Sequence, residues 1–183
     1  MRIPSDTLDQ VATEIGRSSY WWANIEHTLQ SLCVNLARFA DEDLDSEPVW
    51  SVLGTILSHM DVRQRVAVAK VLAAQSVDPD LYGQIERLLN TIDNDLRNER
   101  NRFVHDHWQT DGDAIVRRKY GARVTRPQSR TLAITQSTDR MYDNVAEVAQ
   151  FSGRVASAFD QLAILDRELV DLHEEIWPAQ PID

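Results

Sequence analysis

Apolar residues along the first forty positions recur at alternating steps of three and four residues. An α-helix turns once every 3.6 residues or so, so this spacing places them along one side of a helix. The pattern predicts a long amphipathic helix from about Ser5 to Ala40, with Trp21 widening its buried face. The predicted seam consists of Leu8, Val11, Ile15, Ser18, Trp22, Ile25, Leu29, Leu32, Leu36 and Phe39.

Shorter helical segments follow, separated by breaks in the pattern. Pro48 suits the first turn of a helix, and residues 48–75 predict one bent helix or two short ones with a junction at residues 59–61. A second break at residues 76–79 starts another helix at Asp78 or Pro79. The apolar stripe of that helix runs into the polar segment 97–108. It consists of Leu81, Ile85, Leu88, Leu89, Ile92, Leu96 and Phe103.

The pattern changes after Trp108. Residues 109–113 form a turn signal, residues 114–120 and 130–136 are short and rich in β-branched side chains, and the stretch between them contains Gly and Pro. These features predict a β-hairpin or a flexible basic arm, inserted at about residues 109–136. Helical spacing then returns from about Ser137 to Trp177.

Two long helices flanking shorter ones predict an all-α helical bundle with a small β-hairpin insertion. We expect a single domain over residues 1–183, because the chain is long enough for one sizeable core. Apolar seams of this length often present more apolar surface than a single chain can cover. We therefore expect a homodimer.

Composition limits the class of protein. No apolar run approaches the roughly 18 residues that a membrane span needs, and the first residues lack the apolar core of a signal peptide. The single cysteine, Cys33, excludes an internal disulfide and lies among apolar residues, so we interpret it as a small core residue. We expect a cytoplasmic protein without membrane contact.

The acidic net charge of −10 argues against a general nucleic-acid binder, but the charge is unevenly distributed. Residues 97–130 hold nine Lys/Arg against four Asp/Glu, a local charge of +5, and the rest of the chain carries −15. This basic segment either accepts a polyanion at one place or balances the acidic helices, and the charge count alone leaves both readings open.

The segment RNERNRFVHDHW at residues 97–108 opens this basic region. A histidine exchanges protons near neutral pH, and an arginine grips phosphate oxygens. Such groups suit cleavage of RNA by its own 2′-hydroxyl, a reaction that needs no metal. Arg100 and His105 are about 140° apart on an ideal helix, so they act together only if the helix unwinds after Phe103 or other partners, including a second subunit, take part. We expect the helix to end near Val104.

The spacing Arg100-Asn101-Arg102-Phe103-Val104-His105 resembles the R-N-x-x-x-H signature of the HEPN superfamily. The resemblance implies a small helical bundle that acts as a metal-independent endoribonuclease, in a toxin or antiviral defence setting, with two motifs facing each other across a homodimer. It implies Arg100 as the phosphate or transition-state ligand, Asn101 as the polar residue that follows it, and His105 as acid or base. The resemblance is also compatible with a cognate antitoxin as a protein partner. The alternative is a non-catalytic HEPN-like module that binds a protein partner or a nucleotide.

Several other residues have two readings. Arg97, Arg102, His107, Arg117, Arg118 and Lys119 are the candidate RNA contacts. The arginines of the helix also suit ordinary helix electrostatics, and residues 117–119 equally suit a solvated strand. His105, Asp106 and His107 offer a metal site only with a further ligand, so we expect no metal. Trp108 is interpreted mainly as an anchor onto the bundle. No nucleotide-binding fingerprint stands out, and we expect no cofactor.

Overall fold

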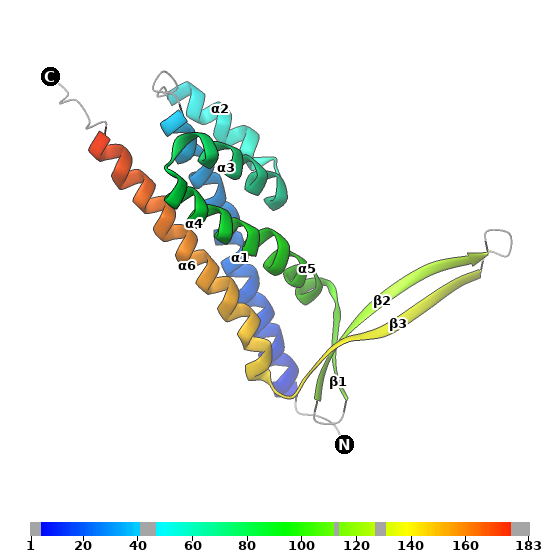
Figure 1. The fold of residues 1–183 in the computed structure, drawn as a ribbon. Helices are drawn as coiled ribbons and strands as arrows, with labels where there is room; N and C mark the ends of the chain where they lie inside the picture. Colours follow the sequence, from blue (N-terminus) through cyan, green and yellow to red (C-terminus); the bar gives the residue numbers. More distant parts are fainter. Residues whose placement is uncertain (1–4, 41–46, 112–113, 127–130, 177–183) are drawn as a thin grey trace. The chain divides into compact units, whose positions relative to one another are not determined.

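The computed structural model describes residues 5–40, 47–111, 114–126 and 131–176 (Figure 1). The chain divides into two compact units. One unit, here called the motif unit, contains residues 1–20 and 97–154, and the other, here called the helical unit, contains residues 21–96 and 155–183. The fold is all-α with a small antiparallel sheet, which confirms the predicted fold class.

The helices largely follow the predicted segments. The long first helix, α1, runs from Ser5 to Ala40, as predicted. The central region forms two separate helices, α2 (Glu47–Ser58) and α3 (Val62–Ser76), followed by α4 (Pro79–Asn90). The predicted break after Ala40 lies outside the described residues at positions 41–46. Among the described helices, none has the length and apolar character needed to cross a membrane.

Side-chain caps explain where α3 and α4 begin. The Asp61 carboxylate accepts from the main-chain N–H of Gln64 at 2.9 Å, and the Gln64 side chain accepts from the N–H of Asp61 at the same distance. This reciprocal pair satisfies main-chain donors that a helix start leaves without partners. Asp78 similarly accepts from Asp80 and Leu81, with Pro79 in the first turn.

The core of the helical unit is mostly apolar, and Arg65 is a buried cation within it. The seam of α1 supplies Trp22, Ile25, Leu29, Leu32 and Leu36, all buried. The last helix, α6 (Val145–Ile176), supplies Val155, Leu162, Leu165 and Leu169. The buried Arg65 guanidinium donates to main-chain carbonyl oxygens of Glu26 (2.7 Å), Leu57 (2.9 Å) and Ser58 (3.3 Å). The last two carbonyls lie at the end of α2, where they have no partner within the helix, so Arg65 joins α3 to that helix end.

A π-helical segment, η2 (Thr91–Leu96), separates α4 from α5 (Arg97–His105). A π-turn takes more residues than an α-turn, and such turns are rare and frequently occur at functional sites. The predicted stripe is nevertheless kept, because Leu89, Ile92, Leu96 and Phe103 are all buried. Helix α5 ends at His105, one residue beyond the predicted end near Val104.

The predicted hairpin is part of a three-stranded antiparallel sheet, ordered β1 (His107–Asp111), β2 (Ala114–Arg126) and β3 (Thr131–Tyr142). β1 pairs only with residues 114–118 of β2, so the rest of β2 pairs with β3 alone. The sheet therefore spans more of the chain than the predicted insertion at 109–136. Residues 109–111, predicted as part of a turn, belong to β1. Of the predicted connection at residues 121–129, residues 121–126 instead belong to β2, and residues 127–129 lie outside the described residues.

The last helix starts later than predicted. α6 begins at Val145 rather than near Ser137, and the six residues before Asp143 belong to β3. The Asn144 side chain accepts from the N–H of Glu147 at 3.1 Å, and the Glu147 carboxylate accepts from the N–H of Asp143 at 3.2 Å. These bonds form the helix cap that defines the boundary. Met141, predicted in the helical seam, is instead an exposed strand residue.

Candidate functional site

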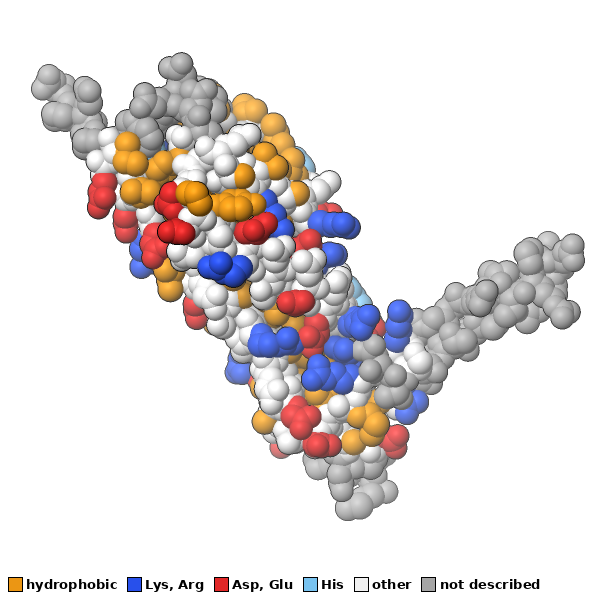
Figure 2. All heavy atoms as spheres, viewed as in Figure 1, with side chains coloured by type: hydrophobic (Ala, Val, Ile, Leu, Met, Phe, Trp, Pro, Cys, Tyr) orange, Lys and Arg blue, Asp and Glu red, His pale blue; other side chains and the backbone are white. Residues whose placement is uncertain are grey.

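The two units differ in charge. The motif unit holds thirteen Lys/Arg and ten Asp/Glu, a net charge of +3, whereas the helical unit holds six Lys/Arg and nineteen Asp/Glu, a net charge of −13. Figure 2 shows Lys and Arg side chains gathered over α5 and the adjoining parts of α6 and the sheet. The basic segment seen in the sequence therefore belongs to a unit that is cationic as a whole.

Helix α5 carries all three motif residues. Asn101 and His105 are exposed, and Arg100 is half-buried. The Arg100 guanidinium donates to the side-chain oxygen of Asn101 at 3.3 Å. Since the helix continues to His105, it does not unwind after Phe103, and Arg100 and His105 remain about 140° apart around its axis. One chain alone therefore does not bring these two side chains onto one helical face.

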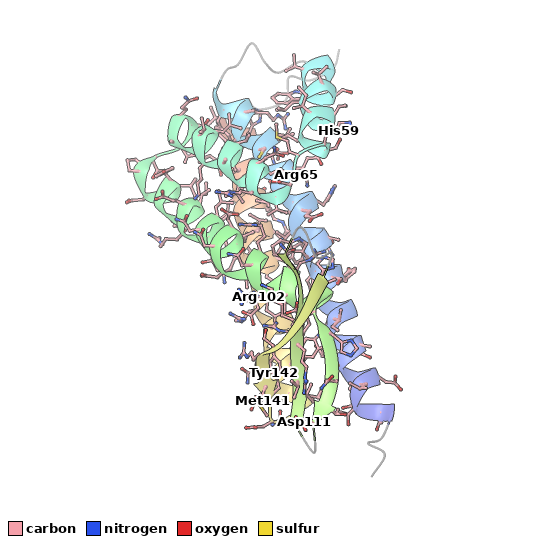
Figure 3. The ribbon with its side chains drawn as sticks, turned by 90° about the vertical axis from the view of Figure 1, so that its right-hand side faces the viewer. His59, Arg65, Arg102, Asp111, Met141 and Tyr142 are labelled. Carbon is pink, nitrogen blue, oxygen red and sulfur yellow. The ribbon has the colours of Figure 1, made fainter. Side chains whose placement is uncertain are left out.

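Four aromatic residues pack around the end of α5 and form what we call the aromatic cluster: Phe103, Trp108, Tyr142 and Phe151. The ring centroid of Phe103 lies 5.0 Å from that of Trp108 and 4.7 Å from that of Phe151. The Trp108 ring stacks on the Tyr142 ring, with 5.4 Å between their centroids. Aromatic pairs at these separations are stabilising by about 0.5–1.5 kcal/mol beyond the burial of their surface. The cluster joins α5, β1, β3 and α6 within the motif unit, and Figure 3 labels Tyr142 on the sheet and Arg102 on α5.

Trp108 is an anchor, as interpreted from the sequence. Its indole N–H donates to the main-chain oxygen of Phe103 at 2.9 Å, and its ring lies between those of Phe103 and Tyr142 in the aromatic cluster. The hydrogen bond satisfies a carbonyl in the last turn of α5, where carbonyls lack partners within the helix. Trp108 thus fixes how the chain turns from the motif helix into β1.

Arg117 is buried, unlike the other candidate RNA contacts. Its side chain is only 3% exposed and lies 3.8 Å from the Asp106 carboxylate. Its guanidinium carbon also lies 5.9 Å from the centre of the Trp108 ring. A buried cation needs such partners because it has lost its water. The structure thus places the Arg117 side chain among contacts within the motif unit, and its role as an RNA contact stays a prediction.

The remaining candidate contacts lie on α5 and at the start of the sheet. Arg102, His107 and Lys119 are exposed, and Arg97 is half-buried. His107 and Arg118 are partners in the β1–β2 register, and Arg118 lies 3.7 Å from the carboxylate of Asp111, which is labelled in Figure 3. These residues, unlike Arg117, keep the surface exposure that contact with a polyanion requires.

Two arginines that no sequence pattern indicated converge on Glu99. Arg140 of β3 donates to one carboxylate oxygen at 3.0 Å, and Arg154 of α6 donates to the other at 2.5 Å. Glu99 is separated from them by 41 and 55 residues, so spacing along the chain gave no signal of the contact. Glu99 immediately precedes Arg100, and the three residues form a charged network beside the motif.

Neither a search for metal ligands among the described residues nor comparison with known proteins adds a residue to the site. Among the described residues, no group of three His, Cys, Asp or Glu side chains could hold a metal ion. Comparison of the chain with protein-family models, curated proteins and solved structures yields no match.

Proposed function

We propose that the protein is a metal-independent endoribonuclease whose site is built from Arg100, Asn101 and His105. The observation that carries the proposal is the exposure of Asn101 and His105 on α5, next to a half-buried Arg100, in the cationic one of the two units. A polyanionic substrate is attracted to a positive surface and repelled by a negative one. RNA is therefore the substrate class that suits this unit.

The reaction needs proton transfer and charge stabilisation. The 2′-oxygen of the RNA attacks the adjacent phosphorus and loses its proton, while the bond to the 5′-oxygen breaks and that oxygen gains a proton. The His105 imidazole is suited to moving one of these protons. Arg100 is suited to holding the non-bridging oxygens, whose negative charge increases in the transition state, and Asn101 is suited to orienting it.

The geometry of α5 favours a site shared between two copies of the chain. Arg100 and His105 of one helix point about 140° apart, so a phosphate bound to Arg100 is out of line with His105 of the same chain. In a symmetric dimer, two copies of α5 that face each other supply the missing group in trans. The proposal therefore includes a homodimer.

RNA cleavage in the presence of EDTA tests this function. His105→Ala should lower the rate by about 10²–10⁴-fold, the usual contribution of a general acid or base. His59→Ala is the matched control, because His59 is an exposed histidine of the helical unit and its loss should leave the rate unchanged. Equal rates for wild type and His105→Ala would overturn the catalytic assignment.

A non-catalytic module is the second candidate. The hydrogen bond between Arg100 and Asn101 and the ion pairs of Glu99 favour it, because such a network can stabilise an interface without performing chemistry. Absence of cleavage by the folded wild-type protein across varied RNAs, together with binding to a protein partner or nucleotide that is lost in Arg100→Ala, would support this candidate instead.

A further inference from the structure

Glu99 lies between two arginines that come from different elements. Each carboxylate oxygen takes one guanidinium, Arg140 at 3.0 Å and Arg154 at 2.5 Å. The Glu99 side chain is 20% exposed, whereas those of Arg140 and Arg154 are 48% and 51% exposed. A guanidinium has five N–H donors, so both arginines retain donors and exposed surface beyond the contact with Glu99.

The aromatic cluster holds both arginines in place independently of Glu99. The guanidinium carbon of Arg140 lies 4.8 Å from the centre of the Tyr142 ring, and that of Arg154 lies 5.5 Å from the centre of the Phe151 ring. A cation over an aromatic face at this distance is attracted to the ring. Each arginine therefore has a second contact that does not involve the Glu99 carboxylate.

We propose that Arg140 and Arg154 form a phosphate-binding subsite for RNA, and that the Glu99 carboxylate occupies it in the free protein. The inference rests on the proposed function, because it takes RNA as the ligand. Carboxylate and phosphate oxygens accept the same charge-assisted hydrogen bonds from guanidinium groups. A phosphodiester of the RNA backbone therefore competes with Glu99 for the same donors.

Displacement is feasible because the contact lies near the surface. Exposed ion pairs are weak, since water and salt screen them. Glu99 also belongs to the motif helix and immediately precedes Arg100, so an RNA phosphate seated between Arg140 and Arg154 lies beside α5. The subsite would then hold the RNA backbone close to the motif, with Glu99 lowering affinity until a phosphate replaces it.

Binding of a fluorescent single-stranded 2′-O-methyl RNA, measured by anisotropy over a range of salt concentrations, tests the subsite. This RNA lacks the 2′-hydroxyl and cannot be cleaved. Glu99→Gln should tighten binding about 3- to 10-fold and steepen the salt dependence by about 0.7 for each added phosphate contact. Asp9→Asn removes the same charge from an exposed position of the motif unit. It should change the affinity and the salt dependence much less than Glu99→Gln does.

The gain must depend on the two arginines. In the Glu99→Gln background, Arg140→Ala with Arg154→Ala should abolish the tighter binding. Circular dichroism checks that each variant is folded. If Glu99→Gln does not fold, Arg140→Gln and Arg154→Gln in the wild-type background serve instead, and each should weaken binding and reduce the salt slope. A gain equal to that of Asp9→Asn, a gain that persists without both arginines, or arginine variants that bind like the wild type would overturn the subsite.

The binding and cleavage experiments distinguish failure of the subsite from failure of the proposed nuclease activity. Arginine-dependent binding of the 2′-O-methyl RNA without cleavage of ordinary RNA would keep the subsite and remove the proposed nuclease activity. If cleavage depends on His105 but substitutions of Glu99, Arg140 and Arg154 leave RNA binding unchanged, the nuclease activity is kept and the subsite is removed. Absence of RNA binding by both wild type and Glu99→Gln would remove the subsite.

Discussion

Cys33 shows how one residue's surroundings decide its chemistry. Its side chain is fully buried, and its sulfur lies 3.5 Å from the main-chain oxygen of Arg65. Burial raises the pKa of the Cys33 thiol to about 12, although the Arg65 guanidinium partly offsets this effect. The thiolate is the reactive form of cysteine, so this residue is not a nucleophile at neutral pH.

We therefore expect the thiol of the native protein to resist a disulfide reagent at pH 8 and to react fully after unfolding in guanidinium chloride. Stoichiometric labelling of the native protein within minutes at pH 8 would contradict the burial.

The raised pKa of Cys33 also affects stability at alkaline pH. An unfolded chain loses the thiol proton near pH 9.0, while the folded chain keeps it, so this group lowers the free energy of unfolding as the pH rises from 9.0 toward 12.

At the scale of elements, the aromatic cluster is one of the contacts that join the motif helix to the sheet. Trp108→Ala removes the ring contacts with Phe103 and Tyr142 and one hydrogen bond. We expect the free energy of unfolding to fall by about 3 kcal/mol, as for other large-to-small changes of aromatic residues. Denaturant titration measures it. Tyr20→Ala is the control, because Tyr20 is 61% exposed in the same unit and its loss should cost less than about 1 kcal/mol.

Elements with strong local signals could be predicted from the sequence. The seam of α1 gave both ends of that helix, and the breaks at residues 59–61 and 76–79 separated α2, α3 and α4. The start of α6 was wrong because Met141 continues the helical spacing of Val145 and Val148 backward. The deciding signal was the Asn144 cap with Glu147 three residues later, which the periodicity does not contain.

The local part of the site could also be predicted, and the long-range part could not. The placement of Arg100, Asn101 and His105 at a helix end and the anchoring by Trp108 follow from neighbouring residues. The contacts of Glu99 with Arg140 and Arg154 depend on the strand register and on the packing of α6. The burial of Arg117 against Asp106 and Trp108 could not be predicted for the same reason, since it is set by the pairing of β1 with β2.

For the whole molecule, the proposed shared site leads to a test by mixing subunits. Light scattering should give about twice the 20.9 kDa mass of one chain. Arg100→Ala and His105→Ala should each be inactive alone. After subunit exchange, one of the two sites in each mixed dimer has both residues intact, so the mixture should recover about a quarter of the wild-type rate. A dimer whose mixed form stays inactive would show that each chain relies on its own Arg100 and His105.

The path of the chain through the two units governs when the motif unit can form. The chain changes unit within α1 after Tyr20, at the start of α5 after Leu96, and within α6 after Arg154. Each unit is therefore assembled from separate stretches, and no single cut of the chain releases either one whole. A ribosome makes residues 97–105 before the strand and helix that supply Tyr142, Phe151 and Arg154. The nascent chain thus carries the motif without its supporting unit until residue 154 has been added. Under the proposed function, this order delays assembly of the RNA-cleaving site during translation of the protein itself.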